Sequence, residues 1–460
     1  MIFIYHFKKY SIMKYGMLIM GCFLLSYSLT CAQTSENIPL SKLYQEAATY
    51  PGLQAEVSSI KSADYDYRLA KQEILPELNL QAQHTFGTFE GAAGAFVPLP
   101  GFFNVSGEGI NGNTAVNTMA SATLKWDFLR FGKYRDQIDL AQINQEQAQT
   151  GFDIKVLELR HQITKAYFGW IHGKAMQDWA KREAERNKSL VKLSSSLVQS
   201  GLAAAADSLI ASTRLKQAIA QQKKWEGQNN RFKNQLLEYT GKAVNIENIP
   251  KSFFSIREVE INDSARNHPL LTEKKYQDEA LKVREKIVDH QVLPDIFLLA
   301  GGLLRGIGYG DNSRAFQDSY ELPISNYLVG VGLTWNLSQW YSKGLKTRKV
   351  QQEQKRVSLE KEAVKRFITE QQNSLQFHIE KSKEEIQEAE GAYRSASESY
   401  RLFKVRYESG LINLTTLLQI QQSLQFTEKA RIQAYYDYWQ YWNNYAYTQA
   451  DFSMLTTIFN

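Results

Sequence analysis

Four short segments of the chain alternate hydrophobic and polar residues with a period of two, the pattern of a β-strand with unlike faces. They span residues 76–89, 116–131, 294–304 and 327–338. In the second segment one face carries Ala120, Ala122, Leu124, Trp126 and Phe128, and the other carries Ser121, Thr123, Lys125 and Asp127. The third segment is apolar on both faces and has the weakest pattern. A Gly-rich stretch without a period, residues 90–114, indicates an exposed loop between the first two segments.

Two other parts of the chain are predicted to be very long helices. No proline interrupts residues 132–199 or 344–409, and each helix would be about 100 Å long at 1.5 Å per residue. In the second stretch the apolar positions step alternately by four and three, the period of a coiled coil, at Ala389, Tyr393, Ala396, Tyr400, Phe403 and Tyr407. Each stretch ends at a Ser-Gly-Leu turn, where glycine accepts the positive φ of a helix end. Return helices should complete helical hairpins over residues 132–240 and 344–450.

The order of strands and helices occurs twice. Trp335 follows Trp126 by 209 residues, and the second Ser-Gly-Leu turn follows the first by the same 209. A fixed spacing is expected across a long helix, because an insertion would rotate one face away from its partners. The earlier landmarks Pro76 and Pro294 are 218 residues apart, so the additional residues lie in loops between the strands. The mature chain is therefore predicted to be one unit duplicated, residues 33–245 and residues 246–460.

Residues 1–32 have the features of a secretory signal peptide: Lys14, an apolar run over 17–29, and small residues before Gln33. The apolar run is too short for a membrane-spanning helix. Translation from Met13 instead of Met1 would leave the same signal, and Cys31 leaves lipidation open although the residues before it suit lipidation poorly. We expect the protein to be exported.

Composition excludes several classes of function. Three of the 54 basic residues lie in the leader, which leaves 51 basic against 48 acidic residues. This near-balance of charge gives no indication that the protein binds nucleic acid. Both cysteines, Cys22 and Cys31, also lie in the leader, so the mature chain offers no disulfide and no Cys-ligated zinc. We find no phosphate-binding loop, no paired catalytic carboxylates and no Ser/His/Asp arrangement. The sequence predicts neither an enzyme nor a cofactor or metal site.

The alternating strands allow an ordinary sandwich with one solvated face or a membrane β-barrel with lipid outside and water inside. The export signal, the lack of an apolar spanning helix and aromatic residues at the strand ends favour the barrel. These belt residues are Trp126, Phe131, Trp335 and Trp340. Four strands cannot close a barrel, since about eight is the smallest known. The polar inward faces need a water-filled lumen, which favours more than eight strands and so an oligomer larger than a dimer.

At this level of detail the chain resembles the TolC family of outer-membrane channels. The matching segments are the one beginning at Leu40 and ending at Ala47, the one from Ala70 to Pro76, and Gly201 followed six residues later by Asp207. Their order and spacing, together with the duplication, extend the resemblance over residues 38–455.

The resemblance implies a mixed α+β membrane protein that forms a homotrimer. Three chains would share a 12-stranded outer-membrane β-barrel above a periplasmic α-barrel of coiled-coil hairpins. The hairpin tips would dock a periplasmic adaptor that recruits an inner-membrane RND or ABC-type pump, as in tripartite efflux and type I secretion. The docking residues implied are Ser200, Gly201, Leu202, Ser409, Gly410 and Leu411.

The resemblance also indicates where the periplasmic gate should lie, and where this chain departs from the family pattern. The family links a tyrosine before the second-turn glycine to an aspartate after the first-turn glycine, here Tyr407 and Asp207. A second link uses an arginine where this chain has Ile412. Two acidic rings of the family are replaced by Thr416 and Gln419. The gate should therefore close by packing and neutral hydrogen bonds.

Two further features have a functional and a packing interpretation. His161 and His172 share a helical face, which allows a metal site, but we favour ordinary packing. Residues 435–447 hold eight aromatic side chains, and because only Arg431 is a basic residue nearby they fit helix packing better than base stacking.

The sequence predicts a passive export duct. The alternative from another class is a structural or adhesive coiled-coil protein anchored by a small barrel, which would not need two matched tip turns. The cargo, the adaptor and the pump cannot be read from the sequence.

Overall fold

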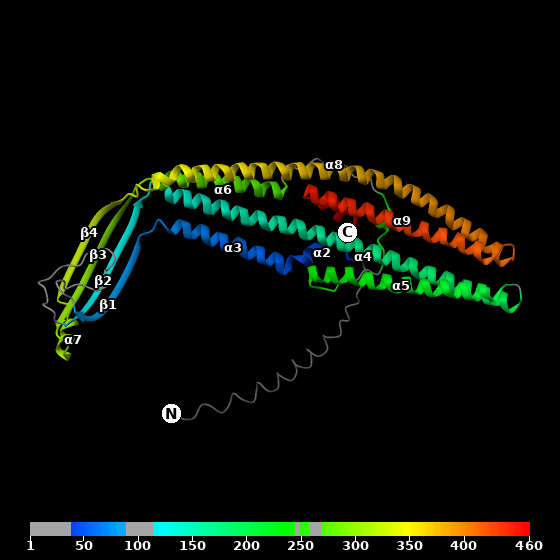
Figure 1. The fold of residues 1–460 in the computed structure, drawn as a ribbon, viewed down its shortest axis with the longest axis horizontal. Coiled ribbons are helices and arrows are strands. Elements are labelled where there is room, and N and C mark those ends of the chain that lie inside the picture. Colours follow the sequence, from blue (N-terminus) through cyan, green and yellow to red (C-terminus); the bar gives the residue numbers. More distant parts are fainter. Residues whose placement is uncertain (1–37, 89–113, 202, 244–247, 257–267) are drawn as a thin grey trace, which may run out of the picture.

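The chain forms one elongated body with a β-sheet at one end and two helical turns at the other (Figure 1). This computed structural model describes residues 38–88, 114–201, 203–243, 248–256 and 268–460. The predicted signal peptide and nearly all of the expected Gly-rich loop lie outside these residues. Within the described part, no helix carries an apolar stretch long enough to cross a membrane.

The sheet contains four strands, each antiparallel to the next, in the order β1-β2-β3-β4. They are β1 (Glu77–Thr88), β2 (Thr114–Leu129), β3 (Asp295–Tyr309) and β4 (Ile324–Thr334). The order follows the sequence, so the two repeats meet where β2 pairs with β3. Strands β1 and β4 each pair on one side only within the chain, which leaves both edges of the sheet open.

The register aligns hydrophobic residues from all four strands into one common face. Leu80 pairs with Ala122, which pairs with Gly302. On the other side of β3, Leu298 pairs with Val331 and Ala300 pairs with Val329. These side chains are unusually exposed for their type, with Leu80 at 78% and Val329 at 69%. A continuous apolar face open to the surroundings is what a lipid-facing sheet requires.

The opposite face is polar over β1 and β2, as the period-two pattern predicted. Gln81 pairs with Ser121 there, and Asn79 pairs with Thr123. On β3 this face carries Leu299 and Leu303, so the third strand is apolar on both sides, as the sequence indicated.

Two strands differ from the sequence prediction by more than two residues at a boundary. Strand β3 continues past residue 304 to Tyr309, because Gly306 and Gly308 carry no side chain and hid the alternation. Strand β4 covers Ile324–Thr334 rather than 327–338, so Trp335 lies just beyond the strand. The following helix already begins at Gln339, five residues earlier than predicted.

The long helices form two hairpins that run away from the sheet. The first consists of α4 (Lys133–Gln199) and α5 (Ala205–Thr240), and the second of α8 (Gln339–Glu408) and α9 (Leu414–Gln449). Helices α4 and α8 contain 67 and 70 residues, about 100 Å each at 1.5 Å per residue. Both turns lie at the same far end of the molecule (Figure 1).

Shorter helices lie beside the half of each long helix nearest the sheet. Helix α3 (Pro51–Gln72) packs on α4, and α6 (Pro269–Gln291), its counterpart in the second repeat, packs between α4 and α8. The helical part before Pro76 breaks at Pro51, where α2 (Leu40–Glu46) and a 3-10 turn (Ala47–Thr49) give way to α3.

The largest hydrophobic core lies near the middle of the helices, between α4 and α9. It includes Phe168, Trp439 and Trp442, all at most 2% exposed. The aromatic run over residues 435–447 packs there, which confirms the packing interpretation. A second 3-10 turn (Lys251–Phe254) and the C-terminal helix α10 (Ser453–Ile458) close this core. The Leu40 amide donates to the Phe459 carbonyl at 3.1 Å and holds the two ends of the described chain together.

Candidate functional site

The two tip turns have the same backbone conformation. Gly201 has φ of +74° and Gly410 has φ of +71°, as expected for glycines that end a helix. At the second tip the Leu411 amide donates to the Arg406 carbonyl at 2.9 Å and the Gly410 amide donates to the Tyr407 carbonyl at 3.0 Å. These are the two bonds of a Schellman ending, and they fix where the chain reverses.

The tips present small and apolar groups to the outside. A Cβ atom placed on either tip glycine would meet no atom within 4 Å. Leu411 is 73% exposed, and Ser200 and Ser409 are exposed beside their glycines. Leu202 lies outside the described residues. The second tip therefore offers an apolar contact next to a backbone that a partner can approach closely.

Beneath the tips, Tyr407 is buried rather than exposed. Its side chain is 4% exposed and packs with Leu190 of the first hairpin and Leu414 and Leu417 of the second. Its hydroxyl has no hydrogen-bond partner among the described residues. Burial and, second, the negative charge of Asp207 raise the pKa of the Tyr407 phenol. The two predicted gate partners are thus close enough to interact electrostatically but are not hydrogen-bonded.

The other predicted gate positions lie in the first turns of α9. The Asn413 side chain caps this helix and accepts hydrogen bonds from both the amide and the hydroxyl of Thr416, at 2.9 and 2.8 Å. Thr416 is therefore engaged in the cap, and Gln419 one turn later is exposed. Ile412 packs on the apolar cluster around Tyr407.

A buried polar network joins the two hairpins above this cluster, and the sequence analysis did not find it. Arg186 of α4 donates from Nη1 to Oε1 of Glu428 on α9 at 3.0 Å, and from Nε to Oε2 of Glu183 at 2.9 Å. The Trp179 indole donates to Glu428 at 3.0 Å, and the Gln421 amide donates to Glu183 at 2.6 Å. Gln425 and Asn187 also contact Glu183.

The charges of this network depend on one another. The side chains of Glu183 and Glu428 are 5% and 8% exposed, and Arg186 is 20% exposed. Burial alone would lower the pKa of Arg186, but the hydrogen bonds and charges of Glu428 and Glu183 raise it above its usual value. No sequence signal marks this set, because its members are far apart along the chain and resemble a solvated helix face.

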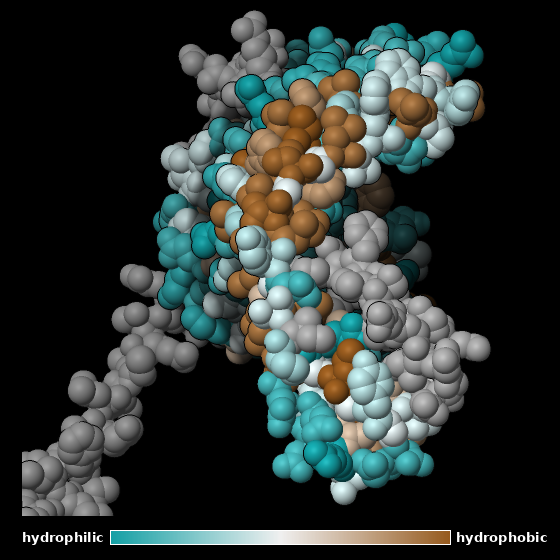
Figure 2. All heavy atoms as spheres, turned by 90° about the vertical axis from the view of Figure 1, so that its left-hand side faces the viewer, coloured by the Kyte–Doolittle hydropathy of each residue, from teal (hydrophilic) through white to brown (hydrophobic). Residues whose placement is uncertain are grey.

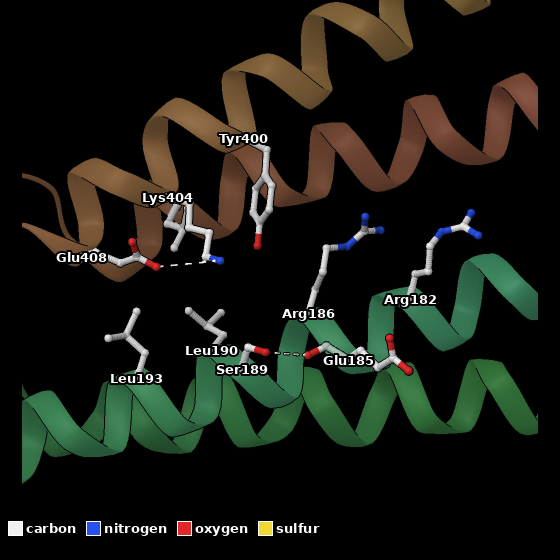
Figure 3. Close-up of a pocket in the computed structure, with 10 residues that line it drawn as sticks. Arg182, Glu185, Arg186, Ser189, Leu190, Leu193, Tyr400, Lys404 and Glu408 are labelled. Atoms are coloured by element: carbon white, nitrogen blue, oxygen red, sulfur yellow. Dashed lines mark hydrogen bonds and ion pairs between the residues drawn. The ribbon is translucent and has the colours of Figure 1, made fainter.

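A cleft of about 450 Å3 separates the hairpins beside the network (Figure 3). Arg182, Glu185 and Leu193 line it from α4, and Tyr400 and Lys404 point into it from α8. The hairpins thus touch at the tip cluster and at the network but leave a gap between α4 and α8.

The histidines singled out in the sequence are packed against aromatic rings. His172 is 7% exposed and stacks on Tyr436 with ring centroids 4.4 Å apart, and burial lowers its pKa to about 4. His161 lies 5.0 Å from the ring of Tyr447. In the part of the chain that the structure describes, no cluster of three or more His, Cys, Asp or Glu side chains could hold a metal ion.

The predicted aromatic belt lies where the sheet meets the helices. Trp126 and Trp335 are 39% and 50% exposed, and Phe131 and Trp340 are 40% and 53% exposed. The Trp126 indole donates to the Ile74 carbonyl and the Trp335 indole to the Val292 carbonyl, both at 2.8 Å. Each tryptophan thus holds the end of its strand against the segment that comes directly before Pro76 or Pro294. Hydrophobic side chains gather over the sheet end of the molecule (Figure 2).

The sequence matches the family model of the outer membrane efflux protein over residues 43–242 and 261–445. Among solved structures, the CusC channel is similar with a TM-score of 0.74 and 13% identity, covering 90% of this chain and 92% of that chain. The CmeC outer membrane channel of Campylobacter jejuni gives 0.73 and 14%, covering 89% and 85%. The MtrE outer membrane channel of Neisseria gonorrhoeae, in its open state, gives 0.71 and 14%, covering 90% and 89%. A search of curated proteins found no match.

Proposed function

Because this chain belongs to the outer membrane efflux protein family, whose members are channels and not enzymes, we propose that it is a passive exit duct of the outer membrane. The duct serves a tripartite efflux pump or a type I secretion system. Its sheet lies in the outer membrane and its long helices extend into the periplasm. The observation that carries the proposal is the arrangement of an open-edged apolar sheet at one end and two matched tip turns at the other.

The sheet supports assembly into a trimer. Its apolar face fits lipid, yet β1 and β4 leave their outer backbone groups unpaired within the chain. In a membrane each unpaired group costs several kcal/mol, so the edges must pair with another chain. Joining β4 of one chain to β1 of the next in three copies gives 12 strands, and a barrel of that size encloses water.

The tips support docking of a periplasmic adaptor. Ser200, Gly201, Ser409, Gly410 and Leu411 lie at the end farthest from the sheet, exposed and held in fixed turns. The adaptor recruits an inner-membrane pump of the RND or ABC type, and that pump selects the cargo. A passive duct needs no ligand pocket of its own.

Conductance tests this function against the adhesive alternative. Purified protein in planar lipid bilayers should form ion channels, because a trimer with polar inner faces encloses a continuous aqueous path. Chains shortened at both tips should conduct more, since the constriction is removed. If neither the full-length protein nor the shortened one ever conducts, the proposed duct function is wrong, and the structural or adhesive role becomes the better explanation.

We predict that Asp207→Ala raises the resting conductance of the channel. The carboxylate lies close enough to Tyr407 to affect its pKa, so its removal loosens the contact between the first and second tips. The matched control is Glu226→Ala, which removes an exposed carboxylate from the same helix far from the tip. If both variants conduct like the parent, packing around Tyr407 closes the gate without Asp207.

We further predict that multivalent cations block the periplasmic mouth weakly. Thr416 and Gln419 occupy positions where rings of carboxylates would attract cations, and Thr416 is held by the Asn413 cap. Titration of a trivalent cation from the periplasmic side should give half-block only well above micromolar concentration. Tight micromolar block would show that other carboxylates line the entrance.

A further inference from the structure

The short helix α7 (Ser313–Ser319), in the connection between β3 and β4, packs directly on the sheet. A Cβ atom at Gly306 would overlap the Ser319 carbonyl, and one at Gly308 would overlap the Ala315 carbonyl. The Thr118 hydroxyl donates to the Ser319 hydroxyl at 3.1 Å. Two glycines and a hydrogen bond therefore fix this helix against the backbones of β2 and β3.

The helix lies on the lipid-facing side of the sheet. Gly306 pairs with Thr118 and Gly308 pairs with Val116, and along β2 these positions continue the face of Ala120, Ala122 and Leu124. A helix on this face cannot belong to the lumen. It covers the end of the apolar face that lies farthest from the periplasmic helices (Figure 1).

The flank of α7 toward β1 is aromatic and remains partly exposed. Phe316 and Tyr320, one helical turn apart, are 37% and 61% exposed. Tyr320 stacks on His84 of β1 with centroids 5.1 Å apart, and Phe316 stacks on Phe86 at 6.0 Å. The other flank carries the exposed pair Arg314 and Asp318. The ring of a tyrosine is apolar and its hydroxyl is polar, so the exposed Tyr320 suits a boundary between lipid and water.

The distance from α7 to the aromatic belt at Trp126 matches the thickness of the apolar part of a membrane. Trp126 pairs with Leu298, and α7 lies over residues 306–308 of the same strand. At about 3.3 Å per residue the separation is roughly 26–33 Å along the strand, or roughly 20–25 Å along the membrane normal at the usual tilt of about 40°. The apolar band of an outer-membrane barrel is about 25 Å tall.

We propose that α7 is an interfacial anchor, with Phe316 and Tyr320 in the headgroup region of the outer leaflet of the membrane. The occupant of this surface is lipid, because the surface continues the lipid-facing face of the sheet and stands one membrane thickness from the belt at Trp126. The proposal rests on the outer-membrane location of the chain. Whether the channel conducts is a separate question, so the anchor can fail while the duct stands.

Spin labels on single cysteines test the anchor, since residues 33–460 contain no cysteine. Phe316→Cys and Tyr320→Cys are labelled in full-length trimers in vesicles of phosphatidylethanolamine and phosphatidylglycerol. Val329→Cys, in the middle of the apolar face, and Asp311→Cys, before the helix, are the reference sites. Collisions with oxygen report lipid, and collisions with a water-soluble nickel chelate report water.

We expect oxygen to dominate at 329 and nickel to dominate at 311, with 316 and 320 giving comparable values for both reagents. Nickel dominance at 316 and 320 would place the helix in water and overturn the proposal. Oxygen dominance equal to that at 329 would place it in hydrocarbon, and low values for both reagents would show cover by protein; either result also overturns it. Chemical crosslinking of each labelled sample confirms that the trimers are assembled, whether or not they conduct.

Discussion

Replacing Gly410 by tryptophan is expected to abolish export while the chain still folds and reaches the outer membrane. The backbone has φ of +71° there, which costs a residue with a side chain roughly 1–2 kcal/mol. That cost is small for a trimer, and the new side chain meets no atom of its own chain within 4 Å of its Cβ. The indole projects instead from the end surface that we propose to dock the adaptor. Export of the partner pump's cargo should fall to the level of cells lacking the gene.

Gly241→Trp is the matched control for this variant. Gly241 ends α5 with φ of +68°, and a Cβ there also meets nothing within 4 Å. The two variants share the backbone strain and the added volume and differ only in distance from the tips. Crosslinking should show normal amounts of trimer for both. Full export by Gly410→Trp would refute the assignment of the tip, and equal loss in both would trace the defect to strain.

Arg186→Met is expected to loosen the contact between the two hairpins. It leaves Glu183 and Glu428 buried without their cation. Removing one partner of a buried ion pair typically costs about 3–5 kcal/mol, because the remaining charge is not compensated. Hydrogen exchange should accelerate in the α4 and α9 peptides that contain these residues, and the resting conductance should rise as the hairpins separate.

The chain offers a control and a rescue for this result. Arg401→Met removes an arginine whose partner Glu398 is on the same helix and exposed, so exchange should barely change. Adding Glu428→Gln to Arg186→Met removes one stranded charge, and the amide oxygen can still accept from Trp179. The double variant should exchange more slowly than the single one. If it exchanges as fast or faster, the network acts through packing and not through charge.

The parts of the fold that could be predicted are those with a regular period or a special backbone. The alternation around Trp126 and the uninterrupted helices on either side of Gly201 and Gly410 follow from local geometry. The end of β3 could not be predicted, because Gly306 and Gly308 interrupt the pattern. The structure explains why these two positions are glycine: α7 packs directly on them and leaves no room for a side chain.

The same distinction applies to the candidate site. The tip turns were recognisable because a glycine with positive φ has a local sequence signature. The network around Arg186 depends on how α4 and α9 are aligned along their axes, and no local sequence pattern encodes that alignment. The sequence left open whether Tyr407 and Asp207 are linked or only pack, and in the structure the Tyr407 hydroxyl has no partner within the described chain. Which groups face each other across two hairpins depends on packing that a single sequence does not show.

The open edges of the sheet also determine how the protein must be made. A single chain emerging in the periplasm presents β1 and β4 unpaired beside a continuous apolar face, which is the surface that templates aggregation. Only encounter with two further copies removes both edges. The yield of channels should therefore rise more steeply than the amount of chain synthesised, and cells expressing little of it should lose a larger fraction of the chains to proteolysis before assembly.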